Sequence, residues 1–170
     1  MPKKYLTKFK TVERSPSAPH VSHSVYSVLG ALIAISLIVL LSKTAATPLL
    51  IAPFGATCVL AFGLPDSPLA QPRNIIGGHL LTAILGLLCY HLMGNTWYSL
   101  ALGVSLSIGL MQITRTVHPP AGANPLVIIL SGASWSFLFS PVLIGSVVLV
   151  AIALIFNNLS SKRKYPKYWF

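Results

Sequence analysis

Charged side chains are almost absent from the middle of this chain, and this absence limits its possible folds more than any other feature. Between Arg14 and Lys162 only four occur: Lys43, Asp66, Arg73 and Arg115. Charged residues are 8% of the sequence and hydrophobic residues are 54%, whereas soluble domains carry about 25% charged residues. Because so few charges cannot cover a soluble surface, the sequence predicts an all-α membrane protein with several transmembrane helices and no soluble globular domain.

The basic residues gather at the two ends of the chain, within residues 1–14 and 162–170. Basic residues that flank apolar spans are typical of the cytoplasmic side of a membrane. This explains the formal charge of +10 better than nucleic-acid binding does. We therefore expect a basic cytoplasmic segment over 1–24, a transmembrane domain over 25–156 and a basic cytoplasmic tail over 157–170. The expected location is a bacterial-type inner (plasma) membrane, crossed several times.

Uncharged apolar runs of about the length that crosses the hydrocarbon core cover residues 25–42, 74–93, 97–114 and 137–156. Two further apolar stretches, 44–65 and 116–132, are interrupted by prolines, which remove a backbone donor and clash with the preceding helical turn. We expect the first of them to be an extended entry followed by a short helix that starts near Pro53.

The pattern Pro-x-Gly-Ala occurs twice, at residues 53–56 and 120–123, with the same order of elements around both copies. We interpret the chain as two three-segment repeats, about 25–93 and 97–156, each with a middle helix broken by Pro and Gly. The helices make four crossings if the broken segments re-enter and six if they cross. The distribution of basic residues favours six, and the two units would then form an inverted repeat.

Paired broken helices are the best sequence indication of a transport site. Inside a bilayer, non-helical backbone must face protein or a wet cavity. A half-helix that begins at such a break points unpaired N–H groups into that cavity, and these groups and the helix dipole favour an anion. The alternative is a pair of kinked helices that contact no substrate.

The residues at or near the two breaks are candidates for substrate binding: Pro53, Gly55, Thr57, Arg73, His79, Arg115, His118, Pro119, Pro120, Gly122 and Asn124. Arginine can hold a planar anion through paired hydrogen bonds, and histidine can donate to an anion or relay a proton near neutral pH. We expect residues 53–57 and 118–124 to approach each other inside the bundle, with Arg115 or Arg73 supplying positive charge.

These polar residues also have structural interpretations. Arg115 can be an interfacial arginine whose side chain extends to the headgroups, and Arg73 can do the same or pair with Asp66. His118 can hold a loop by bonding to backbone carbonyls, and His79 can pack against a neighbouring helix. No nucleotide-binding, serine-nucleophile or histidine-rich metal motif is present. We therefore expect no enzyme activity, no catalytic residues, no metal and no cofactor.

The segment RTVHPPAGANPL, residues 115–126, resembles the signature of the HPP family of integral membrane proteins. The segment APFGATCVLAFGLPDSPLAQPRNIIGGHLL, residues 52–81, resembles the upstream region of the same family. The resemblance covers about residues 48–130. It implies four transmembrane helices, and it implies nitrite transport as known for plant and cyanobacterial members.

These observations predict a small-anion transporter or channel, possibly for nitrite, with the anion held at paired half-helix N-termini and an arginine. The alternative is a membrane structural or sensory subunit without transport activity. The expected partners are a small inorganic anion, the lipid bilayer and further copies of the chain in a homo-oligomer, with no nucleic acid. Small residues at helical spacing, such as Gly78, Thr82 and Gly86, are interpreted as helix-packing positions.

Overall fold

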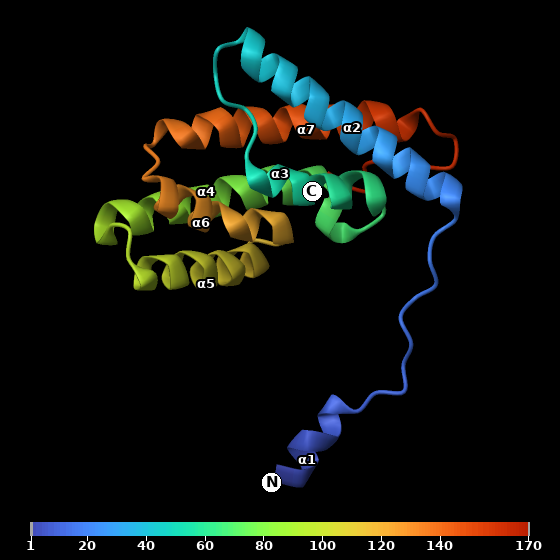
Figure 1. Cartoon of the computed structure of the whole chain (residues 1–170), viewed down its shortest axis with the longest axis horizontal. Coiled ribbons are helices and arrows are strands. Elements are labelled where there is room, and N and C mark those ends of the chain that lie inside the picture. The colour runs from blue at the N-terminus through green and yellow to red at the C-terminus, as the bar shows by residue number, and fades with distance from the viewer. Residues whose placement is uncertain (1, 170) are drawn as a thin grey trace.

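The computed structural model describes residues 2–169, and in that part of the chain it contains helices and no strands, as the sequence predicts. A short helix, α1 (Pro2–Leu6), and the 3₁₀ turn η1 (Thr7–Phe9) lie apart from the other helices, at the end of an extended segment (Figure 1). This segment ends at His20, whose side chain accepts a hydrogen bond from the Ser22 amide and caps the next helix. The first membrane helix therefore begins earlier than residue 25.

Within residues 2–169, three helices are long and apolar enough to cross a membrane. They are α2 (Val21–Thr44), α4 (Pro72–Met93) and the stretch Leu138–Asn158, which joins the π-helical segment η5 (Leu138–Leu143) to α7 (Ile144–Asn158). The helix α5 (Trp97–Ile113) is apolar but shorter. Each of the four predicted unbroken spans is thus helical with ends close to the predicted ones, but the last one is interrupted at Ser140, so it was wrongly predicted to be unbroken.

The turn between α4 and α5 follows from local sequence. Pro72 occupies the start of α4, where its missing N–H removes no helical bond. Gly94 ends the helix with φ 67°, a left-handed conformation that glycine adopts without strain. Thr96 then caps α5, accepting from the Ser99 amide while the Ser99 hydroxyl accepts from the Thr96 amide. The two helices consequently run antiparallel, as Figure 1 shows.

Both predicted breaks are present. After an extended entry, α3 (Ala52–Cys58) begins beside Pro53 and continues into the π-helical turn η2 (Val59–Gly63). The second break contains the 3₁₀ turn η4 (Pro119–Ala123), followed by α6 (Asn124–Ser131). In Figure 1, α3 and α6 begin near the middle of the bundle and run in opposite directions. The inverted repeat stays a prediction, and this arrangement is compatible with it.

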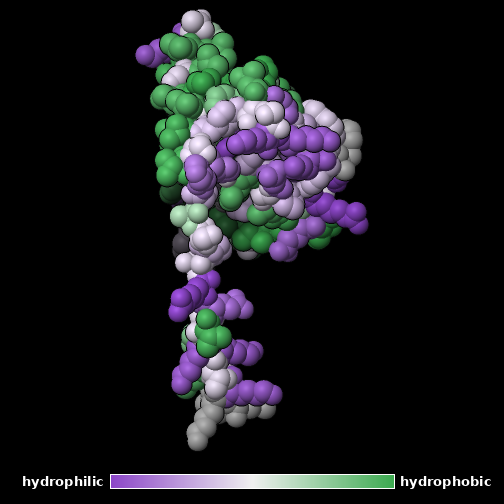
Figure 2. All heavy atoms as spheres, turned by 90° about the vertical axis from the view of Figure 1, so that its right-hand side faces the viewer, coloured by the Kyte–Doolittle hydropathy of each residue, from purple (hydrophilic) through white to green (hydrophobic). Residues whose placement is uncertain are grey.

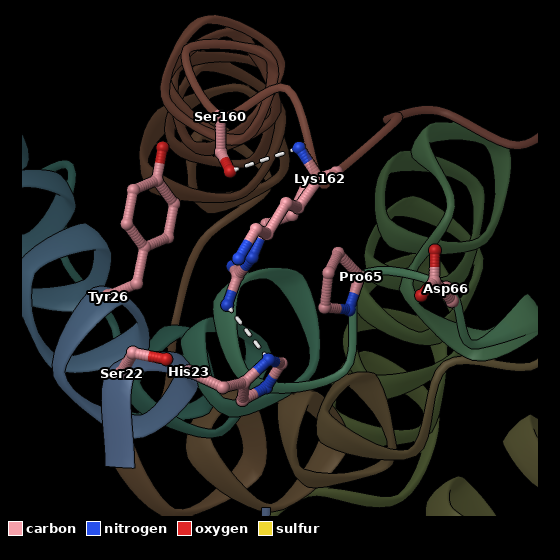
Figure 3. A pocket seen from close by; sticks show the side chains of 8 residues that line it. Ser22, His23, Tyr26, Pro65, Asp66, Ser160 and Lys162 are labelled. Atoms are coloured by element: carbon pink, nitrogen blue, oxygen red, sulfur yellow. Dashed lines mark hydrogen bonds between the residues drawn. The ribbon is translucent and has the colours of Figure 1, made fainter. Parts of the chain in front are cut away.

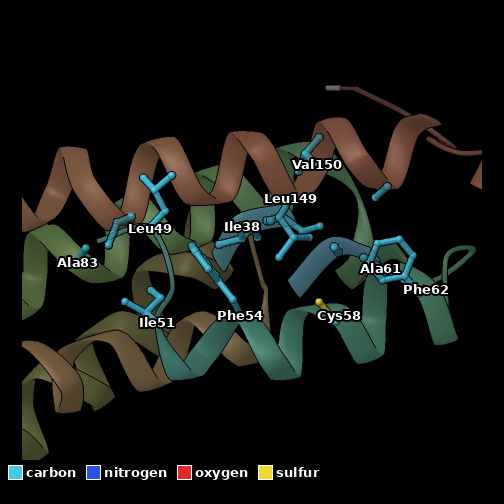
Figure 4. Packing of buried hydrophobic residues seen from close by; sticks show 14 of the residues in the cluster. Ile38, Leu49, Ile51, Phe54, Cys58, Ala61, Phe62, Ala83, Leu149 and Val150 are labelled. Atoms are coloured by element: carbon cyan, nitrogen blue, oxygen red, sulfur yellow. The ribbon is translucent and has the colours of Figure 1, made fainter. Parts of the chain in front are cut away.

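The apolar core lies where α2, α3, η2 and α7 meet. Ile38, Phe54, Phe62 and Leu149 are completely or almost completely buried there, and Figure 4 shows their side chains between α3 and α7. Gly30 allows α2 to pack closely against η2 and α7, because a Cβ at that position would lie 2.8 Å from the Phe156 ring and closer still to Phe62. The core therefore fixes α3 against the two helices that begin and end the membrane domain.

A glycine face of α4 receives the second broken segment. A Cβ at Gly78 would lie 2.9 Å from Cβ of His118, and a Cβ at Gly86 would lie 2.8 Å from Cα of Pro125. Close backbone approach of this kind is the usual role of small residues between membrane helices. The stripe Gly78, Thr82 and Gly86 thus sets how near η4 and α6 come to α4.

Both ends of the membrane domain lie on one face of the bundle. The Tyr26 hydroxyl on α2 donates to the Phe156 carbonyl near the end of α7, at 2.6 Å. Beyond α7 the basic tail packs back on the protein: Tyr165 is buried, and its hydroxyl donates to the Ala70 carbonyl at 2.7 Å. Hydrophilic side chains gather on this face, next to the apolar flank of the bundle (Figure 2).

Candidate functional site

A buried threonine on the first broken helix joins two histidines from other segments. The Oγ1 atom of Thr57 lies 2.9 Å from Nε2 of His79 on α4 and 2.9 Å from Nε2 of His118, which immediately precedes η4. All three side chains are completely buried. The two imidazole rings lie 5.1 Å apart between centroids. The first and second breaks therefore meet at a single hydroxyl group.

Asn124, the first residue of α6, extends this cluster to the second half-helix. Its Nδ2 atom lies 3.0 Å from Nδ1 of His79, 3.0 Å from the His79 carbonyl and 3.0 Å from Oγ1 of Thr82. On the other side, Nδ1 of His118 lies 2.7 Å from the Leu69 carbonyl. The cluster thus connects α3, α4, α6 and the 3₁₀ turn η3 (Pro68–Ala70) that precedes α4.

The partners fix where the protons lie when both histidines are neutral. A carbonyl can only accept, so Nδ1 of His118 carries a proton and Nε2 of His118 accepts from the Thr57 hydroxyl. The Asn124 amide can only donate from Nδ2, so Nδ1 of His79 accepts and Nε2 of His79 donates to Thr57. The result is a directed chain from Asn124 through His79, Thr57 and His118 to Leu69.

One polar atom of the cluster has no partner. Oδ1 of Asn124 is buried and accepts no hydrogen bond among the described residues. Exchanging the amide oxygen and nitrogen would set the oxygen against the His79 carbonyl, so the side-chain orientation is determined. A buried acceptor without a donor is costly. The site therefore offers one free acceptor beside His79 at the start of α6.

The sequence around each break explains why these side chains meet. His118 precedes Pro119 and is extended, with φ −139° and ψ 97°, because a residue before proline is restricted to such conformations. This extended backbone directs its ring away from η4 toward α3. Gly78 permits the approach, since no other residue would leave room for His118 against α4. Phe54 packs against His79 edge to face, 5.1 Å between centroids, and shields the pair from the α2–α7 core.

The predicted approach of residues 53–57 to residues 118–124 is present, but not every candidate residue takes part. The Pro53 carbonyl lies 3.2 Å from Oγ1 of Thr57, as an alternative acceptor for the hydroxyl proton, and Pro120 is buried beside the cluster. Gly55 and Gly122 face open space outside the bundle, and Pro119 is exposed.

The two arginines lie outside the cluster. Arg115 is exposed, has a left-handed φ of 58°, and its guanidinium makes no hydrogen bond within the described residues. Arg73 is half-buried and donates to the Thr114 carbonyl at 3.0 Å, which closes the loop after α5. The suggested pairing of Arg73 with Asp66 is wrong, because Asp66 pairs with Lys167 of the tail at 2.7 Å.

Sequence reasoning missed two members of the site. Thr82 accepts from Asn124 and donates to the His79 carbonyl at 3.2 Å, yet it was interpreted only as a packing residue. Its spacing of three residues from His79 places it on the same helix face, and this was a usable signal. The Leu69 carbonyl carries no sequence signal at all. Within the described residues no group of three His, Cys, Asp or Glu side chains is arranged to hold a metal ion.

The fold and the cluster define a membrane protein of apolar helices with a polar centre where two broken helices meet. Residues 16–166 match the family model described as HPP, transmembrane region. The chain belongs to the HPP family, as its RTVHPPAGANPL segment predicts.

Two relatives are transmembrane proteins of Dictyostelium discoideum. One is 43% identical over 129 residues, which cover 71% of this chain and 45% of the relative. The other is 37% identical over 178 residues, which cover 98% of this chain and 57% of the relative. The chain thus spans about half of the length of these relatives. No solved structure matches it.

Proposed function

We propose that this protein carries a small anion across the membrane and that the chain Asn124–His79–Thr57–His118 is its binding site. Nitrite, whose transport is associated with plant and cyanobacterial members of the family that the chain resembles, is the first candidate. The observation that carries the proposal is the Thr57 hydroxyl, held 2.9 Å from Nε2 of two histidines on different segments. Buried titratable groups in a membrane domain are costly, and they usually mark a pathway for ions or protons.

The helix dipole of the second break supports an anion rather than a cation. The helical run starts with η4, directly after His118, and continues as α6, so the positive end of its dipole lies beside the cluster. The backbone amide of Asn124 already donates to the Ala121 carbonyl, so the dipole and not a free amide at Asn124 makes this contribution. Carboxylates, which would attract a cation, are absent from the cluster: Asp66 lies at the surface, bound to Lys167.

The positive charge that retains the anion comes from a proton in this proposal, because neither arginine reaches the cluster. When a proton enters, one histidine becomes an imidazolium and donates from both ring nitrogens. The directed chain must then reorganise at Thr57, whose hydroxyl can turn to donate or accept. An anion and a proton that enter together and leave together keep the buried site neutral in both states. Transport is therefore coupled to protons.

Nitrite uptake into liposomes that contain the purified protein tests this proposal. We expect an inward proton gradient to accelerate uptake, and we expect His118→Gln and His79→Gln to abolish the acceleration. Arg115→Gln is the matched control, since it removes a cation of the same loop region that the cluster does not use. Uptake that is independent of the proton gradient in the unmodified protein would refute proton coupling. Uptake that survives both histidine changes would refute the binding site.

The second candidate is a membrane structural or sensory subunit. The bond from Nδ1 of His118 to the Leu69 carbonyl favours it, because this bond ties the loop before α4 to the second break. In that case the cluster holds the half-helices together and binds nothing. Undetectable uptake of nitrite and of other small anions by well-folded protein would support this candidate.

A further inference from the structure

A second polar site lies on the face where α2 begins and the basic tail packs. A cavity of about 270 Å³ opens there between α2 and the tail, and its walls include His23, Tyr26, Ser160, Lys162 and Arg163. In Figure 3 the side chains of α2 lie on one side of the cavity, Ser160 and Lys162 lie above it, and Pro65 and Asp66 lie opposite. No residue of the Thr57 cluster lines this cavity.

Arg163 is the half-buried cation of this cavity, and the groups that accept its hydrogen bonds are neutral. Its guanidinium donates to the Phe62 carbonyl at 2.8 Å and to Oδ1 of Asn157 at 2.9 Å. It also donates to Nδ1 of His23 at 3.3 Å, which identifies that ring as neutral, because Nε2 of His23 donates to the Gly63 carbonyl. The guanidinium carbon lies 4.5 Å from the Tyr26 ring centroid.

No carboxylate of the described residues forms a salt bridge with this guanidinium. Asp66 lines the cavity, but it forms its salt bridge with Lys167, and the only other acidic residue, Glu13, lies in the extended N-terminal segment. Burial lowers the pKa of Arg163, while Tyr26 and Asp66 oppose that shift, and arginine stays charged in proteins. Arg163 and Lys162 line the cavity together with the single carboxylate of Asp66, which already pairs with Lys167. The cavity therefore has an excess of positive charge that an anion would offset.

Two further donors, the Lys162 ammonium and the Ser160 hydroxyl, line the cavity. The Lys162 ammonium is exposed at its rim and forms no ion pair among the described residues. The Ser160 hydroxyl oxygen accepts from the Lys162 amide at 3.3 Å, which leaves its proton free to donate. A guanidinium, an ammonium and a hydroxyl around one cavity match the oxygen-rich surface of a phosphate group.

We propose that this cavity binds a phosphate-bearing anion, either the headgroup of an anionic phospholipid or free phosphate, with Arg163 and Lys162 as its charged ligands. The cavity lies level with the start of α2 and the end of α7, and so at the headgroup level of a membrane that these helices cross. Basic pockets between helices at this level are typical sites for anionic headgroups. This proposal is independent of anion transport, because it uses none of the transport residues.

Native mass spectrometry of the full chain in detergent, titrated with phosphatidylglycerol or with phosphatidylcholine, tests the lipid source. We expect phosphatidylglycerol to bind more tightly, and we expect Lys162→Gln to weaken it by about fivefold, the effect of one basic residue near an anionic surface. Lys164→Gln is the matched control: it removes the same charge two residues away, from an exposed side chain outside the cavity.

A parallel arm adds inorganic phosphate and measures the thermal unfolding temperature. A rise that Lys162→Gln reduces, without preference between the two lipids, identifies free phosphate as the ligand and supports the proposal. Equal binding of both lipids together with no phosphate effect overturns it. Equal weakening by Lys162→Gln and Lys164→Gln also overturns it, because the attraction would then belong to the tail as a whole. The proposal does not depend on Arg163 variants, which also lose the helix-end contacts.

Discussion

The candidate site depends on Thr57, because its hydroxyl both accepts and donates within a buried chain of hydrogen bonds. Thr57→Val keeps the shape of the side chain but leaves Nε2–H of His79 and Nε2 of His118 without partners. Each of these two buried unsatisfied groups costs about 1–3 kcal/mol, so we expect the free energy of unfolding to fall by about 2–6 kcal/mol. Chemical unfolding in detergent measures this change.

Thr57→Ser is the control, because serine retains the hydroxyl and loses only a methyl group. We expect it to keep nearly all nitrite uptake, whereas Thr57→Val loses it. If Thr57→Ser and Thr57→Val have equal stability and equal uptake, the hydroxyl of Thr57 contributes neither to folding nor to nitrite binding.

A second residue-scale prediction concerns pH and the buried Tyr165 of the tail. Burial raises the pKa of its hydroxyl above the ordinary value, and the neutral hydroxyl donates to the Ala70 carbonyl. Because the pKa is raised on folding, the Tyr165 hydroxyl ionises in the unfolded chain at a lower pH than in the folded chain. The contribution of the neutral hydroxyl to the free energy of unfolding is therefore complete below about pH 10 and is lost as the pH rises further.

Tyr165→Phe should lower stability by about 1 kcal/mol at neutral pH, the net worth of one hydrogen bond. It should also reduce the alkaline loss of stability, seen as a smaller drop in melting temperature between about pH 8 and about pH 10.5. Tyr168→Phe is the matched control, because Tyr168 is exposed and its hydroxyl bonds Pro68 at the surface. An identical alkaline drop in both variants would contradict the prediction.

The residues of the site were partly predictable from sequence. The HPP triplet and the Pro-x-Gly-Ala pattern indicated His118, Thr57 and Asn124, because proline and glycine mark breaks by local rules. The position of Arg115 was not predictable. Its left-handed φ follows from how the loop after α5 returns to α4, where Asn74 donates to the Val117 carbonyl at 2.9 Å. Such long-range contacts leave no periodic signal.

At the scale of helices, the distance between α4 and α6 is set by Gly86. Gly86→Ala would bring a methyl group to 2.8 Å from Cα of Pro125, a backbone atom that cannot move without α6. Overpacking of this kind costs about 1–3 kcal/mol. Because α6 begins at Asn124, we also expect the shift to separate Asn124 from His79 and to lower nitrite uptake. Thermal unfolding and liposome uptake measure the two effects.

Gly109→Ala on α5 is the control for Gly86→Ala, since a Cβ at Gly109 meets nothing within 4 Å. Alanine is the better helix former by up to about 1 kcal/mol, so this variant should keep or gain stability. If Gly86→Ala is equally well tolerated, α6 is free to move and the close packing has no energetic weight.

The sequence predicted which segments are helical more reliably than it predicted where the helices are interrupted. The predicted span 137–156 is helical, but Ser140 leaves the helical conformation with φ −132° and ψ 119°. The following Pro141 restricts it in this way, so the signal was present and was overlooked. The π-helical end of α3 at Val59–Gly63 has no comparable signal. It arises where this segment packs against α2, and the Ser27 hydroxyl donates to the Phe62 carbonyl at 2.9 Å.

For the whole molecule, the common face of the two chain ends leads to a topology prediction. The contacts between Tyr26 and Phe156 and between His23 and Arg163 fix both ends together. Nine of the twelve basic residues lie in the two terminal segments, five near the start and four near the end, so we expect this face to be cytoplasmic. A fluorescent reporter that matures only in the cytoplasm should be bright at either terminus and dark when inserted at Asn95. A dark reporter at either terminus would contradict the prediction, because that terminus would then lie outside the cytoplasm.

The outer surface of the two breaks is apolar and open. A groove runs between α3 and the second break, lined by Ala52, Pro53, Ala56, Pro119 and Pro120 among others. A Cβ added at Gly55 or Gly122, near this groove, would meet nothing within 4 Å in its own chain. Irregular backbone at membrane depth is stable only when protein or water covers it, and small exposed residues suit close helix contacts.

We therefore expect further copies of the chain to cover this groove in a homo-oligomer. Ala56→Trp should fill the groove and convert the oligomer to monomer, while each chain stays folded because Ala56 is exposed. Leu32→Trp is the control: Leu32 is 60% exposed on α2 and does not line the groove, so the oligomer should persist. Mass photometry in nanodiscs and helical circular dichroism together measure assembly and folding. An unmodified protein that is monomeric in nanodiscs would contradict the prediction, as would an oligomer unaffected by Ala56→Trp, because the groove would then face lipid.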